Sequence, residues 1–362
     1  MNKELTLGTT LDLSELDAKI GQLFMVGIPG CELDEGTRSL IHRYNLGGVI
    51  LFSRNIKDPV QLAYLTKHLQ KEATKTNEIP LFIAVDQEGG RVARLKEPFT
   101  PFPGNSAVGA ADNPEREADE FARITSRELR LVGINMNLAP VLDVKAGELE
   151  RHLSGRTFGE DPRLVSRLGG RVIRTLQENG IIAVAKHFPG LGQATLDPHQ
   201  DLPVINTPLE EMEARDLPPF REAIERGVSA IMTSHAVYTA LDGENPATTS
   251  RTILEELLRT RMGFEGPVIT DDLEMGAIKR HKSVSKAALE ALEAGADILL
   301  ICKDQAQFLE SLNLVRSSIL KGTLPLARLQ QANERIARVK ARFLAEIEEV
   351  PIEEIKSYFK LG

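Results

Sequence analysis

Short apolar runs that alternate with amphipathic segments predict an α/β fold that closes into a (β/α)8 barrel. Eight runs rich in Val, Ile, Leu and Phe recur along the 362 residues, and each is nearly continuous, not alternating with polar residues. Strands of this kind are covered on both faces, as in a parallel sheet. Eight strand–helix repeats fit closure into a barrel, with an open doubly wound sheet as the alternative. No G-x-G-x-x-G follows an early strand, so nothing marks a dinucleotide site.

The predicted strands and helices follow one another along the chain. The strands are expected at 22–28, 48–52, 81–85, 135–144, 181–186, 230–234, 267–270 and 297–302. Amphipathic stretches of helical length lie at 58–75, 114–131, 161–180, 209–226, 250–262 and 283–294. Several begin with Ser, Thr or Asp followed by Pro or Glu, which suit the unpaired amides of a first helical turn. Asn179-Gly180 supplies a helix stop.

The domain organisation predicted from the sequence is simple. No long Pro- or Ser-rich linker divides the chain, so we expect one catalytic domain over residues 1–362, with its core at about 15–322. Residues 323–362 form a C-terminal extension, in which 326–348 predict a long amphipathic helix. Residues 350–362 are expected to trail over the surface. The sequence leaves the oligomeric state open, and a monomer is favoured.

Composition and charge exclude several classes of function. A hydrophobic content of 42% with 27% charged residues is typical of a soluble enzyme with a buried core. The net charge of −8 argues against a general nucleic-acid binder. No apolar stretch approaches the ~20 residues that span a membrane, and the N-terminus lacks the apolar run of a secretory signal. Cys31 and Cys302 are interpreted as two thiols and not a disulfide, so we expect a cytoplasmic protein.

Polar side chains stand where five of the predicted strands end. They are Asp86, Asp143, Lys186-His187, Ser234-His235 and Asp271-Asp272. The carboxyl ends of barrel strands meet on one rim, which favours a shared active site over scattered structural salt bridges. Taken singly, Asp143 could fix a loop through backbone amides and His235 could be a hydrogen-bonded core histidine. Arg156 could cap the next helix or hold a substrate from its long loop.

The loop from Phe188 to Thr207 follows one of these polar strand ends. It has about twenty residues without helix or strand character, and such loops in compact domains are usually functional or disordered. Its prolines and glycines favour a shaped lid that can close over a site. The Asp197-x-His199 spacing would let the carboxylate orient the imidazole and raise its basicity. A solvent-exposed polar loop is the alternative.

Four segments together resemble signatures of glycoside hydrolase family 3. They are 48–55 (GVILFSRN), 85–92 (VDQEGGRV), 186–190 (KHFPG) and 268–275 (VITDDLEM). The likeness extends over 21–297 and is to the single-domain bacterial β-N-acetylglucosaminidases of peptidoglycan recycling. It implies a retaining exo-acting enzyme that releases non-reducing terminal GlcNAc, with a muropeptide fragment as natural substrate and no metal or organic cofactor.

The resemblance also implies roles for individual residues. Asp271 would be the nucleophile that forms a covalent glycosyl-enzyme, and His199 the general acid/base with Asp197 as its partner. The residues that would hold hydroxyls of the sugar in the −1 position are Asp86, Arg156, Lys186 and His187. The chemistry agrees, because retention needs a carboxylate near the anomeric carbon and an imidazole can both donate and accept a proton. Asp272 would point elsewhere.

Two further expectations concern charge and sequence variation. Lys186 and Arg156, as cations beside the carboxylates, should help to keep Asp271 ionised. The loop departs from the family pattern at three positions, where His, Asp and Ser are commonly found; this chain has Leu191, Gln193 and Pro198.

Other hypotheses stay open from the sequence. A family 3 β-glycosidase of different specificity, or a glycoside phosphorylase, would keep the same sugar site. A metal-dependent hydrolase would need a ligand cluster, drawn from His187, His199, His235 and Asp271. No H-E-x-x-H or close His-x-His spacing supports that cluster. A non-catalytic sugar-binding barrel is suggested by the three loop departures, but a pure binder has no need for a nucleophile such as Asp271.

Overall fold

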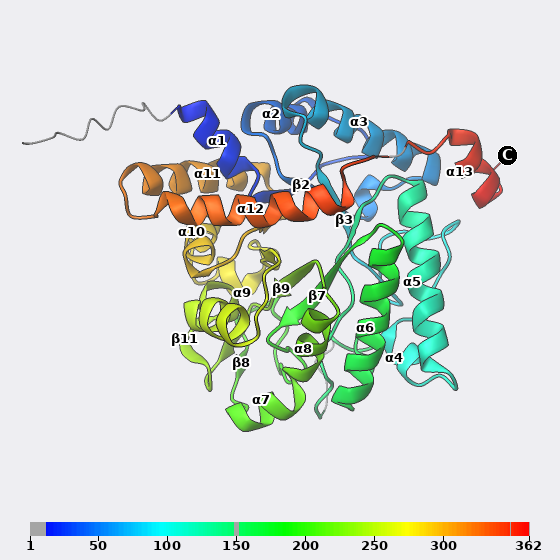
Figure 1. Cartoon of the computed structure of the whole chain (residues 1–362), viewed down its shortest axis with the longest axis vertical. Coiled ribbons are helices and arrows are strands. Elements are labelled where there is room, and N and C mark those ends of the chain that lie inside the picture. The colour runs from blue at the N-terminus through cyan, green and yellow to red at the C-terminus, as the bar shows by residue number, and fades with distance from the viewer. Residues whose placement is uncertain (1–11, 148–151, 348, 362) are drawn as a thin grey trace, which may run out of the picture.

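Eight parallel strands form one sheet in the computed structural model, which describes residues 12–147, 152–347 and 349–361 (Figure 1). The order across the sheet is β12-β9-β7-β6-β3-β2-β1-β13. The strands are β1 (Phe24–Gly27), β2 (Gly48–Leu51), β3 (Phe82–Val85), β6 (Met136–Asn137), β7 (Ile182–Phe188), β9 (Ala230–Thr233), β12 (Val268–Ile269) and β13 (Leu299–Ile301). Each overlaps one of the predicted ranges, so the predicted strand set is confirmed.

The two ends of this sheet order meet and nearly close the barrel. Ile269 and Ile298 form a parallel bridge between the segments of β12 and β13. The Thr270 N–H donates to the Ile298 carbonyl at 2.9 Å, and the Asp297 N–H donates to the Val268 carbonyl at 2.8 Å. These contacts confirm the predicted barrel and exclude the open doubly wound sheet.

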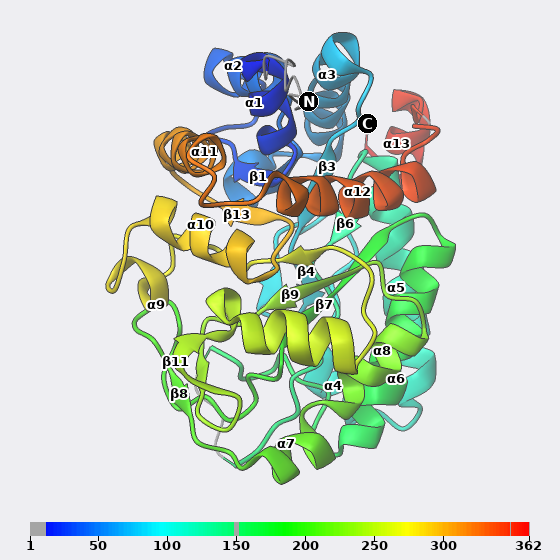
Figure 2. The same cartoon turned by 60° about the vertical axis from the view of Figure 1, so that its left-hand side comes forward.

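The strands are apolar because helices cover them outside and their own side chains fill the barrel. Every residue of β1, β2, β3 and β7 is buried. The surrounding helices are α1 (Leu13–Gly21), α2 (Glu35–Tyr44), α3 (Pro59–Asn77), α5 (Pro114–Leu131), α6 (Pro162–Glu178), α7 (Leu209–Arg215), α8 (Pro218–Glu225), α10 (Val284–Ala294) and α11 (Gln305–Leu320). Figures 1 and 2 show α5, α6 and α8 packed side by side.

Helix starts follow the predicted capping chemistry. Asp58, Asn113 and Asp161 each accept a hydrogen bond from a backbone N–H of the first turn, and proline follows each of them. The single helix predicted over 209–226 was wrong, because Pro218 has no N–H to continue the helix and α7 and α8 form separately. The segment predicted at 250–262 is a π-helix, Thr252–Arg261.

Short elements not predicted from the sequence decorate the barrel. One small sheet pairs β4 (Gln87–Gly89) with β5 (Val92–Ala93). In the other, β10 (Val237–Tyr238) lies between β8 (Val204–Ile205) and β11 (Asp242–Pro246). The short helical turns are η1 (Ser53–Asn55), α4 (Asn105–Gly109), η2 (Ala247–Thr249) and α9 (Gly276–Lys279). Because β8 lies inside 188–207, the prediction that this loop contains no strand was wrong.

The C-terminal extension is more ordered than predicted. The long helix is confirmed as α12 (Leu326–Phe343), but it ends earlier than residue 348. The predicted surface tail instead forms α13 (Ile352–Phe359), which packs beside α3 (Figure 1). The Phe359 ring lies 4.7 Å from the Phe99 ring, because the apolar face of α13 is buried against the body of the protein.

Two further sequence expectations concern membrane-spanning segments and the two cysteines. Within the described ranges, no helix is both long and apolar enough to cross a lipid bilayer. Cys31 and Cys302 are both free thiols, as predicted. Residues 1–11, on which the expectation about a secretory signal rests, lie outside the described residues.

Candidate active site

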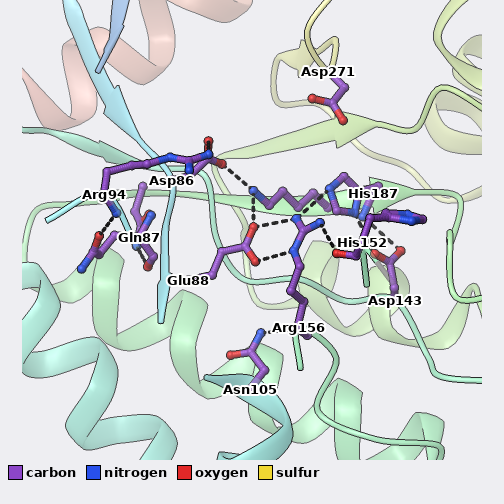
Figure 3. A network of polar contacts seen from close by, with 12 residues as sticks. Asp86, Gln87, Glu88, Arg94, Asn105, Asp143, His152, Arg156, His187 and Asp271 are labelled. Atoms are coloured by element: carbon purple, nitrogen blue, oxygen red, sulfur yellow. Dashed lines mark hydrogen bonds and ion pairs between the residues drawn. The ribbon is translucent and has the colours of Figure 1, made fainter. Parts of the chain in front are cut away.

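The ends of β3 and β7, the two strands that flank β6 in the sheet, place a lysine against two carboxylates. Asp86 directly follows β3, and Lys186 lies near the end of β7. The Lys186 Nζ atom is 2.7 Å from Asp86 Oδ1 and 2.7 Å from Glu88 Oε1, as Figure 3 shows for the network. The Lys186 side chain is buried, with 2% of its surface exposed. The predicted meeting of Asp86 and Lys186 is therefore confirmed.

Arg156 joins the same cluster through a two-pronged ion pair with Glu88. Its Nε and Nη2 atoms each lie 2.8 Å from an oxygen of Glu88, so the planar guanidinium faces the carboxylate. The loop that carries Arg156 is tied down where Asn105 Nδ2 donates to the Arg156 carbonyl at 2.7 Å. The next helix is capped by Asp161, which excludes the capping role for Arg156.

Mutual attraction keeps this buried cluster ionised. Burial alone would raise the pKa of Glu88, but the charges of Arg156 and Lys186 hold it well below its usual range. Burial alone would lower the pKa of Lys186, but Asp86 and Glu88 raise it above its ordinary value. Burial alone would also lower the pKa of Arg156, but Glu88, its main partner, raises it above the ordinary value. The cluster thus presents fixed donors and acceptors to a polar ligand.

His187 is held by a fully buried carboxylate. Its Nδ1 lies 2.7 Å from Asp143 Oδ2, and the other Asp143 oxygen accepts the backbone N–H of Leu191 at 2.7 Å. Asp143 therefore fixes the loop, as one sequence interpretation held, and orients the imidazole as well. With Nδ1–H donating to Asp143, the His187 Nε2 atom is the acceptor and faces Arg156 Nη2 at 3.4 Å.

Asp271 follows β12 and lies across the site from this cluster. Figure 3 shows its carboxylate on the opposite side from Glu88 and turned toward the network. Burial would raise the pKa of Asp271, but the nearby imidazoles of His235 and His187 bring it below its usual value. Lys186 adds a smaller effect in the same direction, as predicted. The two histidines, not the expected pair of cations, contribute most to this lowering of the Asp271 pKa.

The adjacent carboxylate, Asp272, points away from the site as predicted. Its Oδ1 accepts the backbone N–H groups of Glu274 at 3.0 Å and Cys302 at 3.2 Å. Burial is the main cause that raises the pKa of Asp272 to about 7. A carboxyl group held in this way supports the loop after β12 and does not face the cluster.

His235 is a fully hydrogen-bonded core residue beside Asp271. Its Nδ1 accepts from the Thr248 hydroxyl at 2.7 Å, and its Nε2–H donates to the Asp272 carbonyl at 3.0 Å. Burial lowers its pKa. The interpretation as a satisfied core histidine is confirmed, and its place next to Asp271 adds an electrostatic contribution to the site.

The Asp197–His199 pair forms as predicted. Asp197 Oδ1 accepts from the His199 backbone N–H at 2.9 Å and lies 2.8 Å from His199 Nδ1. The His199 side chain is 64% exposed, whereas that of Asp197 is 20% exposed. The loop therefore holds its imidazole near the surface in this conformation.

Sequence reasoning missed three residues of the site. Glu88 stands at the centre of the cluster, Arg94 Nη2 lies 3.3 Å from Asp86 Oδ2, and His152 is buried next to Arg156. The alternation of side chains could have revealed Glu88, since it is two residues after the strand-end Asp86. Among the described residues, no group of three or more His, Cys, Asp or Glu side chains is placed to hold a metal ion.

A parallel (β/α)8 barrel with carboxylates, cations and imidazoles gathered at its strand ends defines an enzyme for a polar substrate. A model of the family described as "Glycosyl hydrolase family 3 N terminal domain" matches residues 15–339. The chain belongs to this family and is therefore a glycoside hydrolase.

Known relatives agree with this membership. A "Beta-hexosaminidase" from Nitrosomonas eutropha is 35% identical over 336 residues, which cover 90% of this chain and 95% of that protein. A "Beta-hexosaminidase" from Tolumonas auensis is 40% identical over 284 residues, 78% of this chain and 83% of that protein. A solved family 3 β-N-acetylglucosaminidase from Paenibacillus sp. str. FPU-7 is 38% identical, with a TM-score of 0.89. The match covers 94% of this chain and 63% of that longer chain.

Proposed function

We propose that this glycoside hydrolase is a retaining exo-β-N-acetylglucosaminidase that removes non-reducing terminal GlcNAc. The observation that carries the proposal is the Asp271 carboxylate, whose pKa lies below the usual value and which faces an ionised cluster suited to sugar hydroxyls. Relatives at 35–40% identity bear the name β-hexosaminidase, which supports the N-acetyl preference. The proposed natural substrate is a muropeptide fragment, and the proposed location of the enzyme is the cytoplasm.

The cluster would bind the terminal sugar by its hydroxyl groups. Asp86 offers a carboxylate acceptor, whereas Lys186 and Arg156 offer donors that cannot accept. Glu88, with both oxygens occupied, holds the two cations in place. Their positions are fixed by the short contacts with one another, so little reorganisation is needed when a sugar arrives. An exo-acting enzyme needs such a set of groups to grip the terminal sugar unit.

The proposed reaction proceeds in two displacements. In the first, an Asp271 oxygen attacks the anomeric carbon while the glycosidic C–O bond breaks and the His199 imidazolium gives its proton to the leaving oxygen. In the second, neutral His199 takes a proton from water, and the water oxygen displaces Asp271 from the anomeric carbon. The exposure of His199 means that the loop must move inward before the first step.

The test compares variants of the two proposed catalytic residues on an aryl β-GlcNAc substrate. Asp271→Ala should lose essentially all turnover, because no covalent intermediate can form. His199→Ala should lose less where the leaving group is already acidic, since such a group departs without protonation. Product stereochemistry followed by NMR should show retention. Asp271→Ala with the wild-type rate, or an inverted product, would refute the mechanism.

The same assay, extended to other aryl sugars, tests specificity. Rates on GlcNAc, GalNAc, Glc and Xyl glycosides should rank GlcNAc first. Asp272→Asn serves as the matched control for Asp271, because Asp272 is adjacent in sequence but turned toward backbone amides. This control should keep much more activity than Asp271→Asn. A sugar phosphate formed when phosphate is added would identify a phosphorylase instead.

A further inference from the structure

His152 is a buried side chain whose polar atoms lack partners. Its exposed fraction is 7%, and neither Nδ1 nor Nε2 has a hydrogen-bond partner within the part of the chain that the structure describes. A buried polar group without a partner destabilises the folded state, because it has given up its hydrogen bonds to water. Two such atoms on one ring, inside a site built of hydrogen-bonded pairs, therefore need an explanation.

The place of His152 beside the cluster is fixed by its neighbours. Its carbonyl accepts a hydrogen bond from Arg156 Nη1 at 3.3 Å, and Figure 3 shows it near His187 and Asp143. Burial lowers its pKa to about 4, with Asp197 and Asp143 opposing the change and His187 and Arg156 reinforcing it. The ring is therefore neutral near pH 7, and offers one N–H donor and one acceptor.

Asp197 offers a matching hydrogen-bond acceptor. Both of its hydrogen bonds to His199 use Oδ1, and Oδ2 accepts none among the described residues. After burial, the Asp197 charge has the largest influence on the pKa of His152, and His152 in turn lowers the pKa of Asp197. Their supporting loops are in contact, since the Ala146 N–H donates to the Gly192 carbonyl at 3.3 Å.

We propose that His152 is a positioning residue for the Asp197–His199 pair. When sugar binds and the loop moves inward, a ring N–H of His152 donates to Asp197 Oδ2. This one contact gives a hydrogen-bond partner both to a ring nitrogen of His152 and to Asp197 Oδ2. Asp197 becomes held from both sides, by His152 on the fixed wall and by His199 on the loop. The inference rests on the proposed function, because it concerns the acid/base group of that reaction.

This role predicts an effect on proton donation and not on sugar binding. His152 acts through Asp197, so its loss leaves Asp86 and Lys186 in place to bind the sugar. What is lost is the orientation of His199 toward the leaving oxygen. Substrates whose leaving group needs a proton will suffer, and those with a strongly acidic leaving group will not.

The experiment compares His152→Leu with wild type on two substrates, 4-methoxyphenyl and 2,4-dinitrophenyl β-GlcNAc. We expect kcat for the 4-methoxyphenyl substrate to fall by roughly 10- to 100-fold, within the range of general acid catalysis. The first step with the dinitrophenyl substrate should change by less than about threefold, with little change in KM for either. His152→Gln, which retains a donor, should recover much of the lost rate.

Controls separate the possible outcomes. His68→Leu removes an imidazole from the surface of α3 and should leave both rates unchanged. His152→Phe keeps a flat ring without nitrogens and replaces the leucine variant if that variant fails to fold. Equal losses on both substrates, a rise in KM alone, or no rescue by glutamine would overturn the inference. Wild-type protein inactive on both substrates would instead refute the proposed function.

Discussion

Glu88 organises the site at the scale of single residues. Its two oxygens bind Arg156 from one loop, and one of them also binds Lys186 from β7. With 1% of its side chain exposed, it has no access to water that could replace these partners. Glu88 therefore sets the distance between two cations that would otherwise repel each other.

Replacing Glu88 with glutamine should damage both stability and activity. The change leaves two buried cations with one anionic partner, Asp86, and breaking a buried ion pair costs about 3–5 kcal/mol. We expect the free energy of unfolding to fall by about 3 kcal/mol, measured by chemical denaturation. The specificity constant kcat/KM should fall by roughly 100-fold, as expected when binding groups are misplaced by about 1 Å.

Glu334→Gln provides the matched control for this prediction. Glu334 is exposed on α12, so the same chemical change should shift stability by less than about 0.5 kcal/mol. If Glu88→Gln behaves like Glu334→Gln in both assays, then Glu88 does not hold the cluster together.

Barrel geometry alone could place strand-end residues on one rim, whereas it could not say where residues on returning loops would lie. Asp86 and Lys186 end apolar runs, so barrel geometry alone brings them to one rim. Arg156 and His152 reach the same place only because their loop folds back over the site. That path depends on contacts such as Asn105 to the Arg156 carbonyl, which pair residues 51 positions apart. No local pattern carries such information.

At the scale of elements, sequence patterns predicted the strands and helix starts that depend on neighbouring residues in the chain. Apolar runs located all eight barrel strands, and Asp-Pro pairs located the starts of α3 and α6. The break between α7 and α8 was missed although Pro218-Pro219 marks it. Helix α13 was missed for a different reason. Its eight residues gain their stability from packing against Phe99 and α3, and this packing is tertiary.

Helix α12 places a lysine inside the protein at the start of the barrel strands. Lys340 Nζ donates to Gln22 Oε1 at 2.8 Å and to the Gly47 carbonyl at 2.9 Å, and it lies 4.8 Å from the centre of the Phe82 ring. These partners precede or begin β1, β2 and β3. Burial lowers the pKa of Lys340 to about 7 from an ordinary value of 10.5.

Because the pKa of the buried Lys340 is lowered in the folded protein, the stability of the fold should depend on pH. Between pH 7 and 10.5 the unfolded chain keeps the Lys340 proton and the folded chain does not. The unfolded state binds more protons there, so stability rises with pH, by up to about 1.4 kcal/mol per unit. The difference in unfolding free energy between wild type and Lys340→Met should shift in favour of wild type over this window. A difference that does not vary with pH would contradict the assignment.

At the scale of the whole molecule, the two ends of the barrel differ in composition. The carboxyl ends of the strands hold the charged cluster, whereas α12 crosses the amino ends. A cavity of about 1190 Å³ lies near those amino ends, lined by residues that include Asn135, Gly180 and Phe343. It contains none of the cluster residues, so its size does not mark the site of chemistry. The sequence predicted the barrel and its active rim because both follow from strand order.

Chelation should leave the activity of the whole enzyme unchanged. The proposed reaction uses a carboxylate and an imidazole, and the described part of the chain has no cluster of three metal-binding side chains. Protein dialysed against EDTA should hydrolyse aryl β-GlcNAc at the untreated rate. A loss that added zinc or magnesium reverses would point to metal-assisted hydrolysis.

The hydrogen bond from the Leu191 N–H to Asp143 restricts the movement of the loop over 188–207. It fixes the start of the loop, and the Gly192 carbonyl just beyond it accepts the Ala146 N–H. At the far side, the pairing of β8 with β10 anchors Val204. The segment between these anchors is held as well, because the Ala277 N–H donates to the Pro198 carbonyl at 2.9 Å. The proposed closure of His199 over a sugar therefore has to break this bond or carry α9 along with the loop.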